Sequence, residues 1–143
     1  MAGAGFDARL SSDIELEMWE KWLLLAGLGA ITCTMRGSIG EVVAAPGGLA
    51  FIDAVLAEVA AIIAVVGRRP RDAVLAGVRA SLTTPGSPQT SSMFRDLQSR
   101  QPIEADQIIG DLLARADNAG VPAPMLRTAY THLSVYQQHL APS

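Results

Sequence analysis

The chain of 143 residues has little lysine, cysteine, histidine and aromatic side chain. Lysine occurs once, as Lys21, whereas the other ten basic residues are arginine. The net charge is −3, and no basic patch is large enough to indicate nucleic-acid binding. The one arginine cluster, residues 68–71, follows an apolar segment, as is typical of a helix C-terminus.

The scarcity of cysteine and histidine limits the chemistry further. The single cysteine, Cys33, cannot form an intramolecular disulfide, and its apolar surroundings predict a buried, unreactive thiol. No pair at ligand spacing indicates a metal site. His132 and His139 are expected at surface or partly buried helix positions, since no nucleophile is indicated for them. The first ten residues lack the features of a secretory signal, and we expect a cytoplasmic protein.

Apolar residues are abundant, at 50% of the chain with a mean hydropathy of +0.29. Such a composition indicates either a membrane span or a large buried interface. Residues 48–66 approach the length of a span but contain Asp53 and Glu58, and an acid at mid-membrane costs about 2.5 kcal/mol or more. Residues 22–35 are too short to cross about 30 Å of hydrocarbon. We therefore expect no membrane association and a large oligomer or domain interface.

Helical signals cover almost the whole sequence, and no segment alternates with period two. The sequence predicts one all-α domain over residues 1–143 with six or seven helices. Two capping boxes, Ser12–Glu15 and Ser38–Glu41, predict the starts of a long first helix ending near Met35 and of a short second helix. The further predicted helices are a buried central one at 49–66, then 70–82, 92–99, 102–119 and a last one after Pro124 that ends near 140, with a loop at 84–90.

Lys21 stands between Trp19 and Trp22, at the start of an apolar run. One interpretation is a surface lysine paired with Glu17, one turn earlier. The other is a proton donor at the edge of a cleft, where partial desolvation lowers the pKa of an ammonium group.

Two further segments carry polar groups at predicted helix starts. Residues 90–92 supply hydroxyls that can cap a helix or help to hold an anion. Glu104 and Asp106 fall in the first turn of a helix expected to begin near Pro102, where acids are stabilised by the helix dipole. Glu104 alternatively accepts a hydrogen bond from a substrate hydroxyl or orients Lys21.

Taken in order, these pieces resemble a known family. The segments that carry the resemblance are Trp19-x-Lys21, Thr32, Ser91-Ser92-Met93-x-x-Asp96, Glu104-x-Asp106 and Ala119-Gly120-Val121-x-x-Pro124. Together they resemble the C-terminal domain of ketopantoate reductases (2-dehydropantoate 2-reductases), over roughly residues 4–140. That domain is helical and is similar to the C-terminal domain of 6-phosphogluconate dehydrogenase.

The resemblance implies NADP-dependent reduction of a 2-oxo acid in a homodimeric enzyme. It implies that Lys21 is the general acid and that Ser92, with Ser91 beside it, holds the substrate carboxylate. Glu104 is implied to contact the substrate and to help set the lysine. An ammonium near a carbonyl that receives hydride stabilises the developing alkoxide most in the transition state.

The sequence departs from the family in two ways. Leu25 and Gly29 stand where the family has asparagines that bind substrate, which indicates a different or more apolar 2-oxo acid. The N-terminal Rossmann domain is expected to be absent, because the glycines of residues 1–5 follow no strand and therefore do not form a dinucleotide-binding loop. The alternative hypothesis is a non-catalytic helical interaction or dimerisation module that retains the fold.

Overall fold

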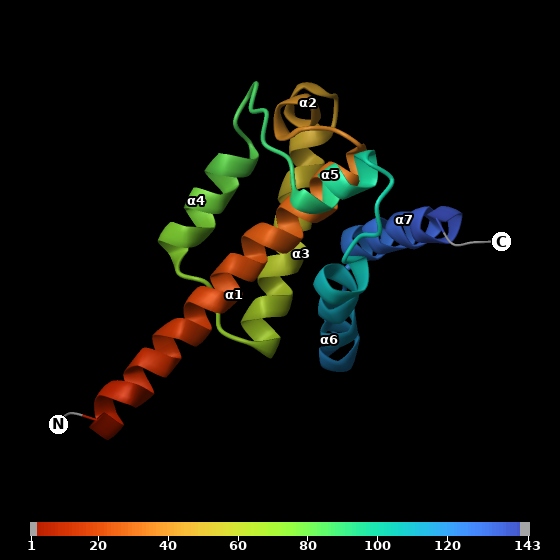
Figure 1. Cartoon of the computed structure of the whole chain (residues 1–143). Helices are drawn as coiled ribbons and strands as arrows, with labels where there is room; N and C mark the ends of the chain where they lie inside the picture. The colour runs from red at the N-terminus through yellow and green to blue at the C-terminus, as the bar shows by residue number, and fades with distance from the viewer. Residues whose placement is uncertain (1–2, 141–143) are drawn as a thin grey trace.

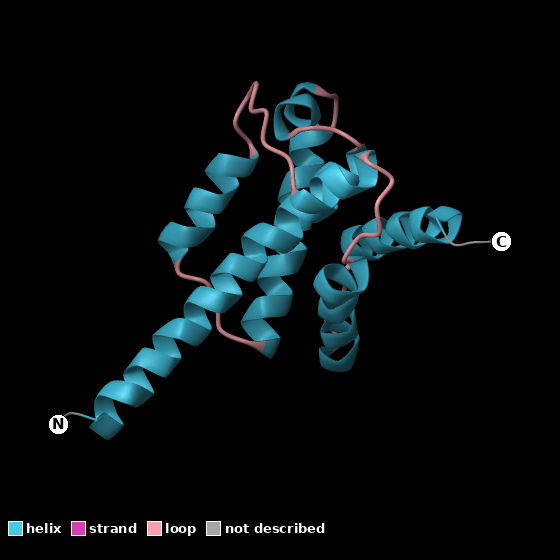
Figure 2. Ribbon diagram, in the orientation of Figure 1, coloured by secondary structure: helices cyan, strands magenta, loops and turns pink. Residues whose placement is uncertain are grey.

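The structure, a computed structural model, describes the backbone of residues 3–140 and the side chains of residues 14–140. The described residues form seven α-helices and one π-helical turn, with no strand, which confirms the all-α prediction (Figures 1 and 2). The elements are α1 (Gly3–Met35), α2 (Ile39–Ala44), α3 (Gly48–Val66), α4 (Asp72–Leu82), α5 (Ser92–Gln98), η1 (Asp106–Gly110), α6 (Asp111–Ala119) and α7 (Pro124–Leu140).

The long helix α1 begins at Gly3, so the predicted start at the Ser12 capping box is wrong. Alanine, arginine and leucine in residues 4–10 are strong helix formers, and a serine inside a helix costs only a few tenths of a kcal/mol. The helix therefore continues through Ser12 instead of starting there. The side chain of Ser12 lies outside the described residues. In Figure 1 the N-terminal part of α1 extends beyond the other helices.

The helix α1 ends where Arg36 adopts a left-handed φ of 56° and the Gly37 N–H donates to the Thr32 carbonyl over 3.2 Å. The capping box predicted for α2 is present and complete. The Ser38 N–H donates to Glu41 Oε1 over 2.8 Å, and the Glu41 N–H donates to Ser38 Oγ over 3.3 Å.

The central helix α3 is the one described helix that is long and apolar enough to cross a membrane by length and composition. It packs against α1, α2, α4, α6 and α7, with Ile52, Val59 and Ile63 fully buried. Both of its acids bond to neighbouring helices. Asp53 accepts from Arg79 of α4 over 2.8 Å, and Glu58 accepts from the first free N–H groups of α7. The helix is therefore packed on several sides, but the predicted burial is only partial: 28% of its most apolar window is buried, and Leu49 and Val65 are exposed at 46% and 61%.

The helix expected to begin at Pro102 begins later, because residues 101–104 have no helical structure. It opens with a π-turn in which the Asp111 N–H donates to the carbonyl of Asp106, five residues earlier. The Tyr130 ring of α7 lies beside Gly110, and its hydroxyl donates to the Asp106 carboxylate. This tertiary contact, absent from any local pattern, accompanies the wider turn.

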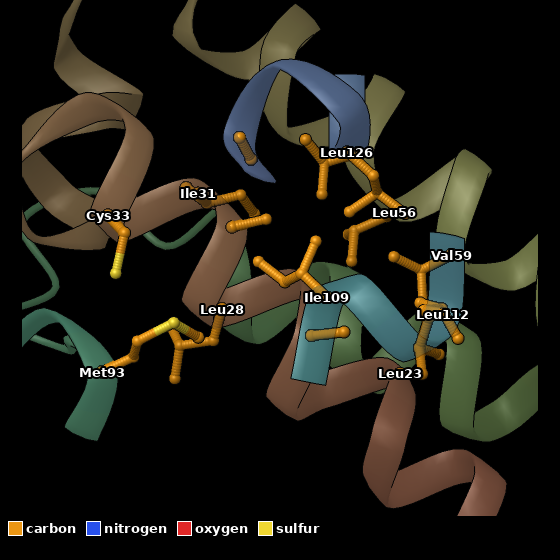
Figure 3. Packing of buried hydrophobic residues seen from close by; sticks show 14 of the residues in the cluster. Leu23, Leu28, Ile31, Cys33, Leu56, Val59, Met93, Ile109, Leu112 and Leu126 are labelled. Carbon is orange, nitrogen blue, oxygen red and sulfur yellow. The ribbon is translucent and has the colours of Figure 1, made fainter. Parts of the chain in front are cut away.

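One hydrophobic core joins all seven α-helices and η1, and Figure 3 shows part of it. The fully buried large side chains are Leu23, Ile31, Ile39, Ile52, Ile62, Ile63, Leu82, Leu97, Ile109, Leu112, Leu126 and Leu133. Cys33 also belongs to this core and is a free thiol, as predicted. Its burial raises the pKa of the thiol to about 11.

Candidate functional site

Lys21 lies on an uncovered face of α1. Ile14, Met18 and Leu25 share this face at helical spacing, with exposed fractions of 57%, 51% and 39%. We call these four residues the Lys21 face. Lys21 is itself exposed and forms no ion pair with Glu17, so the paired-surface interpretation is not observed.

The Lys21 face ends where α5 crosses α1. Gly29, two turns after Lys21, is buried there, and a Cβ on it would lie 2.7 Å from Cε of Met93. Lys21 and Gly29 are about 12 Å apart along the helix axis, from eight residues at about 1.5 Å each. Leu25 lies between these two positions on the same helix and is 39% exposed.

The start of α5 is fixed to α1 by a buried pair of hydroxyls. Ser91 is the N-cap, and its Oγ accepts from the Phe94 N–H over 2.9 Å. The same Oγ lies 2.9 Å from Thr32 Oγ1, which also donates to the Leu28 carbonyl over 2.7 Å. The hydroxyl of Ser91 is thus engaged in hydrogen bonds inside the core.

Ser92, the first residue of α5, is exposed, and its hydroxyl forms no hydrogen bond within the described part of the chain. The rigid attachment of Ser91 therefore presents Ser92 outward, next to the end of the Lys21 face.

Glu104 lies in the extended segment that leads into η1, and its side chain is exposed. The helix α1 packs against α5, which begins at Ser92, and against η1, which begins two residues after Glu104. No hydrogen bond or ion pair joins the side chains of Lys21, Ser92 and Glu104 in the described part of the chain. These three side chains are therefore free of one another.

One anchor of this region was not found from the sequence. Glu20, next to Lys21 but on the opposite side of α1, is 6% exposed and accepts from Arg71 Nη2 over 2.6 Å, Arg71 Nε over 2.9 Å and the Arg71 backbone N–H over 2.9 Å. The hydrogen bond from the Arg71 side chain lowers the pKa of Glu20. The only sequence feature that pointed to this pair was the arginine cluster at 68–71. Because that cluster was interpreted as charge at a helix C-terminus, the partner of Arg71 was not predicted.

A dinucleotide cofactor has no binding site among the described residues. They contain no strand, and Gly3 and Gly5 lie within α1, so the strand, glycine turn and helix on which a pyrophosphate rests are not formed.

Comparison with known proteins identifies the family. The model of the family described as "Ketopantoate reductase PanE/ApbA C terminal" matches residues 13–137. The uncharacterized oxidoreductase YkpB of Bacillus subtilis is 26% identical over 136 residues, which are 95% of this chain and 45% of that protein.

Solved structures show the same fold. A dimeric ketopantoate reductase from Staphylococcus aureus matches with a TM-score of 0.79 and 23% identity, over 90% of this chain and 45% of its own. A D-mandelate dehydrogenase, solved with NADH and anilino(oxo)acetate, matches with a TM-score of 0.74 and 17% identity, over 90% of this chain and 42% of its own. The chain thus spans less than half the length of these relatives. It belongs to the family of ketopantoate reductase C-terminal domains.

Proposed function

We propose that this chain is the substrate-binding and dimerisation part of an NADP-dependent oxidoreductase that reduces a 2-oxo acid. The observation that carries the proposal is the Lys21 face. It leaves a lone ammonium exposed on a rigid helix, about 12 Å along the helix axis from Gly29, where Met93 of the helix that begins with the exposed Ser92 lies against α1.

The carboxylate of the substrate would be bound at the start of α5. Ser92 is the exposed hydroxyl there and donates to the carboxylate, while Ser91 holds α5 in place through Thr32. The side chain of the substrate would lie on Leu25, an apolar residue at a family position for a polar one. A hydrophobic contact of this kind favours an apolar 2-oxo acid over ketopantoate. The D-mandelate dehydrogenase neighbour, bound to anilino(oxo)acetate, supports this substrate class.

Lys21 would act as the general acid. The nicotinamide cofactor, when bound by its own domain, supplies hydride to the keto carbon. As the carbonyl oxygen gains negative charge, Lys21 Nζ donates a hydrogen bond and then a proton to it, which yields the hydroxyl group. The neutral lysine regains its proton from solvent. Glu104, carried by the neighbouring segment, would accept from the substrate hydroxyl and orient the ammonium.

The cofactor domain would dock on the Lys21 face. Ile14 and Met18 form an exposed apolar strip that no other described helix covers. Exposed apolar strips of this kind mark interaction surfaces. A Rossmann domain seated there would also exclude water from Lys21. The dimeric relative supports a homodimer, and the ketopantoate reductase relatives are consistent with a cytoplasmic location.

The test is turnover by the chain combined with a nicotinamide-binding domain, as one polypeptide or as two. We expect oxidation of NADPH with apolar 2-oxo acids such as 4-methyl-2-oxopentanoate or phenylglyoxylate, and weaker activity with ketopantoate. NADH is tested in parallel, because one structural neighbour was solved with it. No activity with any 2-oxo acid and either cofactor, in an assembly shown to bind the cofactor, would contradict the proposal.

The second candidate is a helical interaction module without chemistry. Leu25 and Gly29, which replace polar substrate ligands, are the observations in its favour. It predicts that the same assembly forms a dimer and binds its partner domain equally well when Lys21 is replaced by methionine, with no turnover in either case.

A further inference from the structure

A second candidate site lies at the other end of α1. A cavity of about 440 Å³ is bounded by the C-terminal ends of α1 and α5 and by the second half of α7. Its polar lining consists of Gln98, Tyr136 and four basic residues, Arg36, Arg100, His132 and His139. We call it the arginine–histidine cavity. Arg36 is about 22 Å from Lys21 along the helix axis, so this cavity is separate from the Lys21 face.

The charge of the cavity is opposite to that of the chain. No carboxylate belongs to its lining, although the chain carries a net charge of −3. Arg36 and Arg100 form no ion pair among the described residues. A concave surface lined by unpaired cations attracts small anions.

The backbone supports a functional role for both arginines. Arg36 has a φ of 56° and Arg100 a φ of 57°, and these are the only non-glycine residues with positive φ in the described chain. They follow different helices, yet both line the same cavity. Glycine is the usual residue at such positions. Favourable charge at a helix C-terminus explains an arginine near each end, but it does not explain why both strained residues meet at one cavity.

His132 adds an unsatisfied polar atom. Its Nε2 is buried and has no hydrogen-bond partner in the described structure. Burial lowers the pKa of His132, and the neighbouring charge of Arg36 lowers it further. Cys33 and Arg36 face this ring from α1, Arg100 lies beyond α5, and Tyr136 and His139 lie on α7. A bound anion would give Nε2 a partner and favour the protonated ring.

We propose that the arginine–histidine cavity binds a small-molecule dianion, an organic phosphate or a dicarboxylate, with Arg36, Arg100 and His132 as its ligands. Arginine forms paired hydrogen bonds with both phosphate and carboxylate groups. This inference does not depend on the proposed reductase function.

The experiment is calorimetric titration of the purified chain with pyrophosphate and with glutarate, at one fixed low ionic strength. The test variant is the double substitution Arg36→Gly and Arg100→Gly. Because glycine prefers positive φ, this variant should keep or gain stability while it loses both charges. We expect binding of at least one ligand by the native chain and a Kd at least ~10-fold weaker in the variant.

The matched control is Arg95→Gln, which removes one exposed positive charge of α5 outside the cavity. This variant should bind as the native chain does. Histidine resonances provide a second readout, since the ligand should shift His132 toward its protonated form. Binding of pyrophosphate alone identifies phosphates, and binding of glutarate alone identifies dicarboxylates. The proposal fails if neither ligand binds the native chain more tightly than the double variant, or if Arg95→Gln weakens binding as much.

Discussion

The hydroxyls of Thr32 and Ser91 lie 2.9 Å apart in the core and join the long helix α1 to the first turn of α5. Both residues are buried, at 0% and 8% exposure. The pair converts two distant sequence segments into one rigid corner, and Ser92 projects from that corner.

Removing either hydroxyl of this pair should destabilise the domain. Ser91→Ala removes the N-cap and the buried bond, and we expect a loss of about 1–3 kcal/mol in the free energy of unfolding. Thr32→Val should cost about 1–2 kcal/mol. Urea unfolding of both single variants and the double variant gives the coupling energy. A double variant whose loss equals the sum of the two single losses would show that the hydroxyl pair carries no energy of its own.

The Glu20–Arg71 pair should make stability depend on acidity. The pKa of Glu20 is lowered from 4.5 in the folded state, so its contribution is fully present above pH 4.5 and is lost as pH falls through the folded-state pKa. Glu20→Gln should therefore flatten the acid limb of a plot of unfolding free energy against pH. Glu17→Gln, on the exposed side of the same helix, is the control and should leave that limb unchanged. Equal slopes in all three proteins would contradict this assignment.

Two glycines should respond differently to alanine. A Cβ on Gly67 would lie 2.2 Å from Cε2 of the buried Trp19 ring, which cannot move aside. Gly67→Ala should cost at least ~2 kcal/mol. At Gly29 the obstacle is the flexible end of Met93, and the gain in helix propensity is up to ~1 kcal/mol, so Gly29→Ala should stay within ~1 kcal/mol of the native chain. Thermal unfolding of both variants checks the order, and a larger loss at Gly29 would refute it.

Two substitutions distinguish the role of Lys21 as a positive charge from its role as a proton donor. In the assembled reductase, Lys21→Met should lower kcat by about 10²–10⁴-fold. Lys21→Arg keeps the positive charge, but a guanidinium holds its proton too tightly to donate it. This variant should therefore recover substrate binding more than turnover. Because Lys21 is exposed, neither change should alter stability. An unchanged kcat in Lys21→Met would exclude this residue as the general acid.

Cys33 should be unreactive in the folded chain. The thiol is fully buried and its pKa is about 11, so almost no thiolate is available near neutral pH. Iodoacetamide should label Cys33 at the rate of global unfolding, and rapidly in urea. Fast labelling of the native chain would show that the α1–α5 junction opens locally.

The sequence was most informative where structure is decided locally. The Ser38 capping box and the helix ends at Val66 and Ala119 were predicted correctly, because each depends on a few adjacent residues. The start of α1 was wrong because a capping pattern competes poorly with strong helix formers on both sides. The late start after Pro102 coincides with packing against Tyr130, a residue from a different helix.

Of the features of the candidate site, the sequence predicted some and missed others. The motif around Ser92 gave the correct helix start, and burial of Cys33 followed from its neighbours. The unpaired state of Lys21, the role of Ser91 within the core and the arginine–histidine cavity depend on how distant helices cross. The roles of Lys21, Ser92 and Glu104 stay predictions until the assembled enzyme is assayed.

The π-turn at η1 is equivalent to one extra residue inserted into a helix. Each residue of an α-helix advances the chain by about 100° around the axis. Deleting Gln107 would therefore restore an ordinary helix and rotate everything before it, Glu104 included, by about a quarter turn relative to α6. A single-codon deletion would thus move Glu104 around the helix axis together with the buried Ile103 and Ala105, while the core positions of α6 stay in place.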